Sequence, residues 1–210
     1  GWGAWAGPTM EDVVIVDLRR MDRIVELDAR NMYAVVEPYV CGAQLQAEAM
    51  KVGLNTHIIG AGPNCSPLAS ATSAWGVGHD SIYMSYSARN LLGVEWVLPS
   101  GEVLRLGTLG SSGDWFNGDG PGPSLRGIMR GHCGAQGGMG VFTKVGIKLH
   151  HWPGPPELPT ETGGFLTGYR LKRVPENAKM ITPSFKDYET LTAFLRGKQH
   201  ERILLSFSFA

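Results

Sequence analysis

The 210-residue sequence is poor in charge and contains no long hydrophobic run. Charged residues make up only 18% of it, and 19 basic side chains balance 19 acidic ones. Because no stretch of like charge is present, neither a nucleic-acid groove nor a polybasic membrane patch is indicated. No apolar run approaches the ~20 residues that cross a bilayer, and the first residues do not resemble a signal peptide. A chain with so little charge is expected to be covered in part by another domain, a cofactor or another subunit.

Cysteine is also scarce, with Cys41, Cys65 and Cys133 as the three examples. Their number is odd and no two of them form a CxxC pair, whereas disulfide frameworks and structural zinc sites use paired cysteines. The sequence therefore predicts no metal site and a reducing, cytoplasmic location, with membrane association only through a partner.

Glycine, by contrast, is abundant, with 29 residues, and it gathers in three stretches at 1–8, 60–81 and 130–144. Backbone N–H groups in such loops can converge on an anion, and the missing side chains allow a ligand to approach closely. None of the three matches the P-loop pattern GxxxxGK[ST], and none has GxGxxG between a strand and a helix. Turn formation in a plain scaffold domain would explain one such loop, but three separated by short strands favour a large phosphate-bearing cofactor.

Hydrophobic periodicity indicates a domain that mixes strands and helices, of the α+β class. A helix over 41–53 is predicted from its helix-forming residues, with Gly53 as the closing glycine. A β-hairpin over 90–107 follows from two apolar runs around a Pro-Ser-Gly turn. The stretch 60–81 is predicted to be a long irregular loop, and such loops are commonly functional. Further strands are expected at 13–18, 23–28, 31–38 and 140–150.

The segment HWPGPPELP at 151–159 is rich in proline and marks the best domain boundary. We predict one domain over residues 1–155 and the start of a second α+β unit over residues 156–210, with a strand, a helix and a further strand. Both ends suggest a piece of a longer protein, because a compact glycine-rich loop opens the sequence and the strand-like ILLSFSFA closes it.

Histidine and cysteine stand side by side at His132 and Cys133, inside the third glycine-rich stretch. Catalytic Cys–His pairs come together from distant positions, and neighbours in a strand point to opposite faces. Packing beneath a loop is therefore the preferred interpretation of this pair. For His79, in the segment GVGHD, the sequence leaves open whether the side chain faces a ligand.

Five segments follow one another in a recognisable order between residue 1 and about residue 155. They are GWGAWAGP with VVIVDLRRMDRI, AVVEPYVCGAQL, ATSAWG, GVEWVLPSGEVLRLG and GAQGGMGVFTKVGIKL. Together they resemble the flavoproteins of the vanillyl-alcohol oxidase and p-cresol methylhydroxylase type, a family that includes the FAD-linked glycolate and D-lactate dehydrogenases. The resemblance implies the second, larger subdomain of that family's FAD-binding domain, followed by the start of a ferredoxin-like α+β substrate cap.

The same resemblance implies FAD as the cofactor, with bare backbone in the glycine-rich loops because the cofactor lies against it. The first segment would neutralise the diphosphate, the second would run near the pyrophosphate and the flavin ring, and the third would pass the adenine and ribose. The cofactor-binding residues expected on this basis are Gly1, Gly3, Ala4, Ala6, Gly7, Pro63, Ser70, Ala71, Ser73, Ala74, Gly76, Gly78, His79, Gly138, Gly140, Val141 and Thr143. No catalytic residue is assigned, because the metal-ligand histidines and substrate arginines of the hydroxy-acid branch would lie beyond residue 210.

Ala74 bears on the substrate. In the phenol-oxidising branch of the family an acidic residue stands just before the RGVG segment, and Ala74 occupies the matching place here. The sequence is therefore closer to the 2-hydroxy-acid branch, whose ATNAGG segment matches ATSAWG, although Trp75 replaces a small residue there. We expect oxidation of a small 2-hydroxy carboxylate, similar to glycolate or D-lactate, by hydride transfer to the flavin.

Two alternatives to this activity stay open. The protein could be an alcohol or phenol oxidase of the same family, or an FAD-holding electron-transfer subunit of a larger complex. A homo-oligomer or a subunit of a complex is expected. The electron acceptor (dioxygen, a quinone or a protein) and a covalent flavin link are not determined by the sequence.

Overall fold

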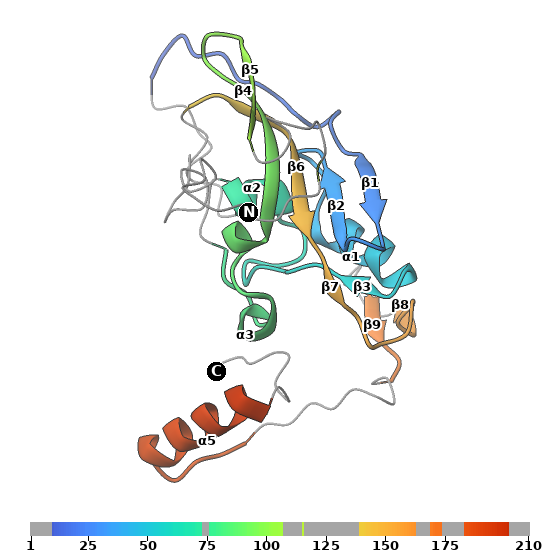
Figure 1. The fold of residues 1–210 in the computed structure, drawn as a ribbon, viewed down its shortest axis with the longest axis vertical. Coiled ribbons are helices and arrows are strands. Elements are labelled where there is room, and N and C mark those ends of the chain that lie inside the picture. The colour runs from blue at the N-terminus through green and yellow to red at the C-terminus, as the bar shows by residue number, and fades with distance from the viewer. Residues whose placement is uncertain are drawn as a thin grey trace.

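A computed structural model of the chain describes residues 10–72, 76–106, 115, 139–162, 169–173 and 183–201. At its centre lies an antiparallel five-stranded sheet with the strand order β1-β2-β6-β4-β5 (Figure 1). The strands of this sheet are β1 (Ile24–Asp28), β2 (Tyr33–Val36), β4 (Leu91–Val97), β5 (Val103–Leu106) and β6 (Val141–Lys148).

Two of the strand pairs are local hairpins. The Asp28 carboxylate accepts the N–H groups of Arg30 and Asn31, at 2.8 and 2.9 Å, and this closes the turn between β1 and β2. The β4–β5 turn is closed by the N–H of Gly101, which donates to the carbonyl of Leu98 at 2.8 Å. Strand β6 is different, because it arrives from far along the chain and pairs with β2 on one side and β4 on the other.

Helices and short strands make up the rest of the described elements. The helix α5 (Tyr188–Glu201), drawn in red in Figure 1, lies at the end of the described chain, apart from the sheet. The remaining elements are α1 (Gly42–Lys51), β3 (Leu54–Asn55), α2 (Pro67–Thr72), α3 (Ser81–Met84), the 3₁₀ helix η2 (Ser87–Asn90), β7 (His150–His151), β8 (Thr160–Thr162) and β9 (Tyr169–Leu171).

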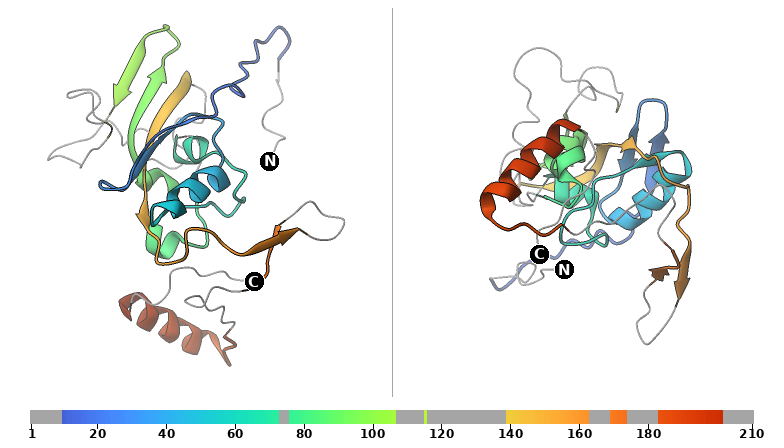
Figure 2. Two further views of the ribbon diagram at one scale, coloured as in Figure 1. Left: turned by 90° about the vertical axis from the view of Figure 1, so that its right-hand side faces the viewer. Right: turned by 90° about the horizontal axis from the view of Figure 1, so that it is seen from below.

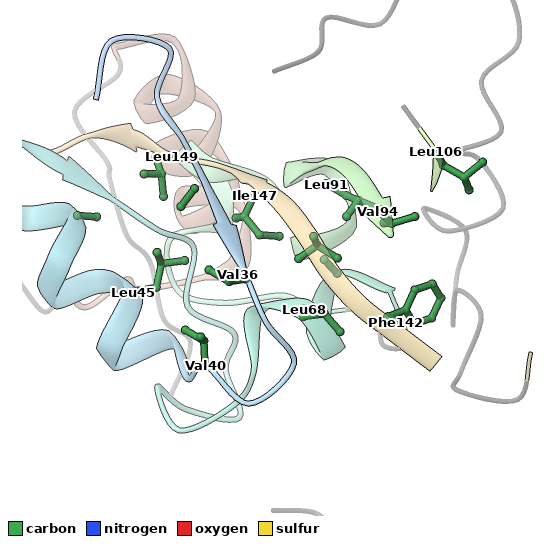
Figure 3. Close-up of a cluster of buried hydrophobic side chains, with 14 of the residues drawn as sticks. Val36, Val40, Leu45, Leu68, Leu91, Val94, Leu106, Phe142, Ile147 and Leu149 are labelled. Atoms are coloured by element: carbon green, nitrogen blue, oxygen red, sulfur yellow. The ribbon is translucent and has the colours of Figure 1, made fainter. Parts of the chain in front are cut away.

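The hydrophobic core lies between the sheet and the helices α1 and α2, which cover the same face of it (Figure 2). Leu45 from α1 and Leu68 from α2 point toward Val36, Leu91 and Ile147 on the strands (Figure 3). Leu45 and Leu91 have no exposed surface, and burying such a side chain contributes about 1.5–3 kcal/mol. This packing joins the first helical segment to the sheet and positions the loops between α1 and β4.

A buried carboxylate holds the end of β2 against the start of β1. Glu37 is only 2% exposed, and it accepts hydrogen bonds from the Arg23 main chain at 3.0 Å and from the guanidinium at 2.8 and 3.2 Å. The N–H of Glu37 donates in return to the Arg23 carbonyl at 3.1 Å. The guanidinium hydrogen bonds hold the pKa of Glu37 below its usual value, so this clamp is present at neutral pH.

We expect the Glu37→Gln variant to lose about 2 kcal/mol of stability at neutral pH, because the charge-assisted hydrogen bonds are lost inside the protein. The folded-state pKa of Glu37 is lowered, so its contribution is present above pH 4.5 and declines as the pH falls below that value. Urea unfolding of both proteins at pH 7 and pH 3 measures the difference. Glu48→Gln, at an exposed ion pair with Lys51, is the matched control and should change stability by less than about 0.5 kcal/mol. A Glu37→Gln effect as small as that of the control would contradict the prediction.

Most of the predicted elements are confirmed. The structure has strands at 24–28, 33–36 and 141–148, the hairpin of β4 and β5, and α1 with Gly53 at φ +75° just beyond its last turn. The fold class is the mixed α and β architecture that the sequence predicts. The domain boundary near residue 155 stays a prediction. The expected strand near the end of the chain falls outside the described residues.

Two predictions are wrong. Residues 13–18 form no strand, and Val14, Ile15 and Val16 are 90%, 76% and 61% exposed, because no strand of the described chain pairs with them. The stretch 60–81 is not irregular throughout, since it contains α2. Small residues such as Ala69 and Ser70 gave this helix the composition of a loop. Pro67 was a signal for its start, because proline is common in the first turn of a helix.

Candidate functional site

A small cavity opens between the start of α1, the segment 56–59, α2, η2 and the C-terminal half of β6. Its volume is about 20 Å³, which is room for about one water molecule. Polar and apolar side chains both line it, among them Thr56, His57, Ile58, Ile59, Ser70, Ser87, Asn90 and Ile147.

The start of α1 is closed by the chain itself. The N–H groups of Gly42 and Ala43 donate to the carbonyls of Cys65 and Pro63, at 2.9 and 2.8 Å. These N–H groups belong to the first turn of a helix, which is otherwise a common place to bind an anion. Because loop carbonyls already occupy them, α1 offers no free anion site in its first two residues.

His57 stands at the wall of the cavity, and its side chain is only 3% exposed. Its Nδ1 lies 2.5 Å from the Asp80 carboxylate, and its Nε2 lies 3.2 Å from the carbonyl of Gly76. The second carboxylate oxygen of Asp80 accepts the N–H of Ile58 at 3.0 Å. Through these contacts the segment 57–58 holds the loop that precedes α3.

The cavity wall carries one polar atom with no partner. Thr56 is fully buried, and its hydroxyl makes no hydrogen bond within the described part of the chain. Burying a hydroxyl without a partner costs about 1–3 kcal/mol. Thr56 is also one of the residues that line the cavity, which has room for about one water molecule.

Packing within the protein requires glycine at three described positions of the glycine-rich stretches 60–81 and 130–144. A Cβ on Gly78 would overlap the carbonyl oxygen of Ile58, and a Cβ on Gly76 would overlap the side chains of Ile59 and Ser87. Gly140, at φ +120°, would meet the carbonyl of Val97. The bare backbone at these three positions therefore has a structural cause, independent of any cofactor.

The expected cofactor residues fall into two described groups. Pro63 and His79 are exposed, Ser70 and Gly76 are buried, and Gly78 is half-buried. Ser70 belongs to α2 and lines the cavity, whereas the other four lie in the loops before and after α2. Ala71 is different, because it is 1% exposed and belongs to the hydrophobic core. The residues of the expected site outside the described part of the chain are Gly1, Gly3, Ala4, Ala6, Gly7, Ser73, Ala74 and Gly138.

The second group, formed by Gly140, Val141 and Thr143, lies at the N-terminal end of β6. Gly140 and Val141 precede and open the strand, whereas Ile147 at its far end lines the cavity. Seven residues of strand span about 24 Å. The hydroxyl of Thr143 donates to the Glu95 carboxylate at 3.0 Å, so its side chain is already held by β4. The two groups therefore lie near opposite ends of one strand, β6.

Sequence reasoning missed His57 and Asp80. They are 23 positions apart, and no short motif joins them. His79, which the sequence singled out, has an exposed side chain, while its neighbour Asp80 makes the contacts. Within the described ranges no three His, Cys, Asp or Glu side chains gather as a metal site, and no helix is long and apolar enough to cross a bilayer.

A family profile described as "FAD binding domain" matches residues 2–107. The chain therefore belongs to this family of FAD-binding flavoproteins, and its cofactor is FAD. Among the described residues expected at the cofactor, Pro63 and His79 are exposed and so are accessible to such a group.

Several individual proteins and solved structures are similar to this chain. The flavoprotein subunit of 4-cresol dehydrogenase (hydroxylating) from Pseudomonas putida is 31% identical over 167 residues, 74% of this chain and 29% of that protein. A crystal structure of p-cresol methylhydroxylase with substrate bound has 28% identity and a TM-score of 0.55, over 66% of this chain and 26% of that one. The 4-ethylphenol oxidase of Gulosibacter chungangensis, solved with isoeugenol, has 30% identity and a TM-score of 0.51, over 67% and 26%. The chain spans less than a third of the length of the curated relatives it matches.

Proposed function

We propose that the protein is an FAD-dependent oxidoreductase that oxidises a small organic molecule by hydride transfer to the flavin. The observation that carries this proposal is the match of residues 2–107 to the FAD-binding family, together with relatives that are FAD-linked oxidoreductases. The flavin supplies the redox chemistry, and the protein supplies binding, orientation and electrostatics.

The residues of this chain would act by holding FAD. Pro63, Ser70, Gly76, Gly78 and His79 are proposed to line the pyrophosphate and flavin part. Main-chain atoms at Gly140, Val141 and Thr143 are proposed to pass the adenine and ribose, together with Gly138. Ala71, Ser73 and Ala74 are proposed to belong to the pyrophosphate and flavin part. The first segment, with Gly1, Gly3, Ala4, Ala6 and Gly7, is proposed to neutralise the diphosphate. Residues beyond about 155 are proposed to begin the substrate cap, so the groups that bind substrate and accept its proton would come from there.

The better supported substrate is a phenol with an alkyl group para to the hydroxyl. Two relatives at 30–31% identity carry the names 4-cresol dehydrogenase and 4-ethylphenol oxidase. A 2-hydroxy carboxylate is the second candidate, because Ala74 stands where the phenol-oxidising branch has an acidic residue. That argument depends on one position, whereas the relatives match over two thirds of the chain or more.

The 4-cresol dehydrogenase chain is itself a flavoprotein subunit, which supports assembly with a partner. We propose that the complete protein is a homo-oligomer or such a subunit and that it passes electrons onward. An FAD-holding electron-transfer subunit without a substrate of its own would bind FAD equally well. Reduction by a substrate therefore separates the two possibilities.

The first experiment is a visible absorption spectrum of the full-length protein before and after acid precipitation. Flavin bands are expected, and colour that stays with the pellet would show a covalent link. The oxidised protein is then mixed without oxygen with 4-ethylphenol or with D-lactate. Bleaching of the flavin by one of them identifies the substrate class, while bleaching by neither favours the electron-transfer subunit. A colourless protein that takes up no added FAD would overturn the proposal.

A further inference from the structure

We propose that His57 and Asp80 are positioning residues that fix the loop 76–80 in the conformation that receives FAD. This inference rests on the proposed function, because the loop is assigned to FAD by that proposal. The pair touches the loop and the cavity wall rather than any reacting atom. Its effect on the cofactor would pass through the main chain of Gly76, Val77 and Gly78.

Asp80 ties the loop to the neighbouring segment through both of its carboxylate oxygens. One oxygen lies 2.5 Å from Nδ1 of His57, and the other accepts the Ile58 N–H at 3.0 Å. The carboxylate is 19% exposed and the imidazole 3% exposed, so water competes little for these bonds. A charged acceptor that takes two donors in this way holds a main-chain segment more firmly than a neutral hydrogen bond does.

His57 adds a second link to the same loop. Its Nε2 lies 3.2 Å from the carbonyl of Gly76, so both ring nitrogens face acceptor oxygens. The same Gly76 carbonyl also accepts the N–H of Ser87 at 2.8 Å, which connects the loop to η2.

Hydrogen bonds and close packing against neighbouring segments also fix the conformation of the loop 76–80. The N–H of Gly60 donates to the Val77 carbonyl at 2.8 Å, and the N–H of Gly78 donates to the Ser81 hydroxyl at 2.8 Å. A Cβ on Gly78 would overlap the carbonyl of Ile58, the residue that Asp80 also holds. Losing the His57–Asp80 link would therefore let the loop move away from Ile58 and shift the main chain of Gly76, Val77 and Gly78.

The experiment uses the full-length protein and compares Asp80→Asn, His57→Gln and the double variant with the wild type. Each single variant is expected to raise the FAD dissociation constant about tenfold, the scale of a hydrogen bond to a charged group. The double variant should show about the same tenfold rise, because both residues act through one link. Where FAD is covalently held, the flavin absorption maximum and midpoint potential replace the dissociation constant and should shift in each variant.

Asp28→Asn is the matched control, because Asp28 also closes a turn by accepting two main-chain N–H groups, but between β1 and β2. It should leave FAD binding and the flavin spectrum unchanged. Folded variants of His57 and Asp80 that bind FAD with wild-type affinity and spectrum would overturn the inference. A wild-type protein that binds no FAD would instead overturn the proposed function.

Hydrogen exchange of the Ile58 amide keeps the inference testable if the variants do not fold. In the wild-type protein this N–H donates to Asp80, so FAD binding should slow its exchange about tenfold. Equal exchange rates with and without FAD would mean that the link is not coupled to the cofactor, and the inference would then be wrong.

Discussion

The Gly140→Ala variant should lose about 3 kcal/mol of folding stability or fail to accumulate as folded protein. Gly140 has φ +120°, a conformation that alanine rarely adopts. Its Cβ would overlap the Val97 carbonyl and lie 2.8 Å from Nε1 of Trp96. Val97 pairs with Val141 in the sheet, so its carbonyl cannot move without breaking the contact between β4 and β6. Urea unfolding of the full-length, FAD-loaded protein measures the loss.

Gly101→Ala is the matched control for this variant. Gly101 also has a positive φ, +88°, but an added Cβ there would have no atom within 4 Å. It should therefore show only the conformational cost, about 1–2 kcal/mol. The difference between the two variants isolates the steric overlap, which is about 1–3 kcal/mol for an overpacked site. Equal losses would show that β4 and β6 can separate locally to admit the methyl group.

Folding stability should fall by about 3 kcal/mol as the pH is lowered from 6.5 to 4. Burial lowers the pKa of His150 from 6.5 to about 4, and the nearby positive charge of Lys148 adds to this. Between these two values the unfolded chain binds a proton that the folded protein does not, so stability rises with pH across the window. The His150 side chain is held by Asn90, whose side-chain amide oxygen Oδ1 lies 2.8 Å from Nε2, and by the ring of Tyr83.

The test is the urea midpoint of the wild-type protein and of His150→Asn, measured at intervals between pH 7 and pH 4. The variant should be less stable at pH 7 but should lose most of the pH dependence above pH 4.5. His151→Asn is the control, because His151 is exposed and adjacent in the sequence. Below pH 4.5 both proteins should lose further stability as Glu37 becomes protonated. A slope that survives in His150→Asn would assign the pH dependence to another group.

Local patterns accounted for much of the fold. The hairpin of β4 and β5 and the helix α1 were predictable, because their turn residues and hydrophobic periodicity are local properties of the sequence. The run Val13–Val16 misled the prediction for the same reason. Its composition is typical of a strand, but a strand needs neighbours, and these side chains remain exposed within the described part of the chain.

The candidate site was predictable only as a family pattern. Motif order pointed to FAD and to the loops around Ser70 and Gly140, which stay predictions residue by residue. It could not show that Gly76, Gly78 and Gly140 lack side chains because the chain packs on itself there. Nor could it show that Asp80, and not His79, makes the contacts. The residue types in a loop do not reveal the direction in which each side chain points.

The sequence by itself determined that this is an FAD-binding protein of mixed α and β structure, because the ordered motifs and turn residues are properties of short segments. Only the tertiary structure decided which side chains meet. His57 and Asp80 come together because the helices α1 and α2 bury their apolar faces against the sheet, which brings the segment after β3 into contact with the segment after α2. The hydrophobic effect that drives this packing is non-directional, so the polar contacts it creates cannot be derived from local sequence.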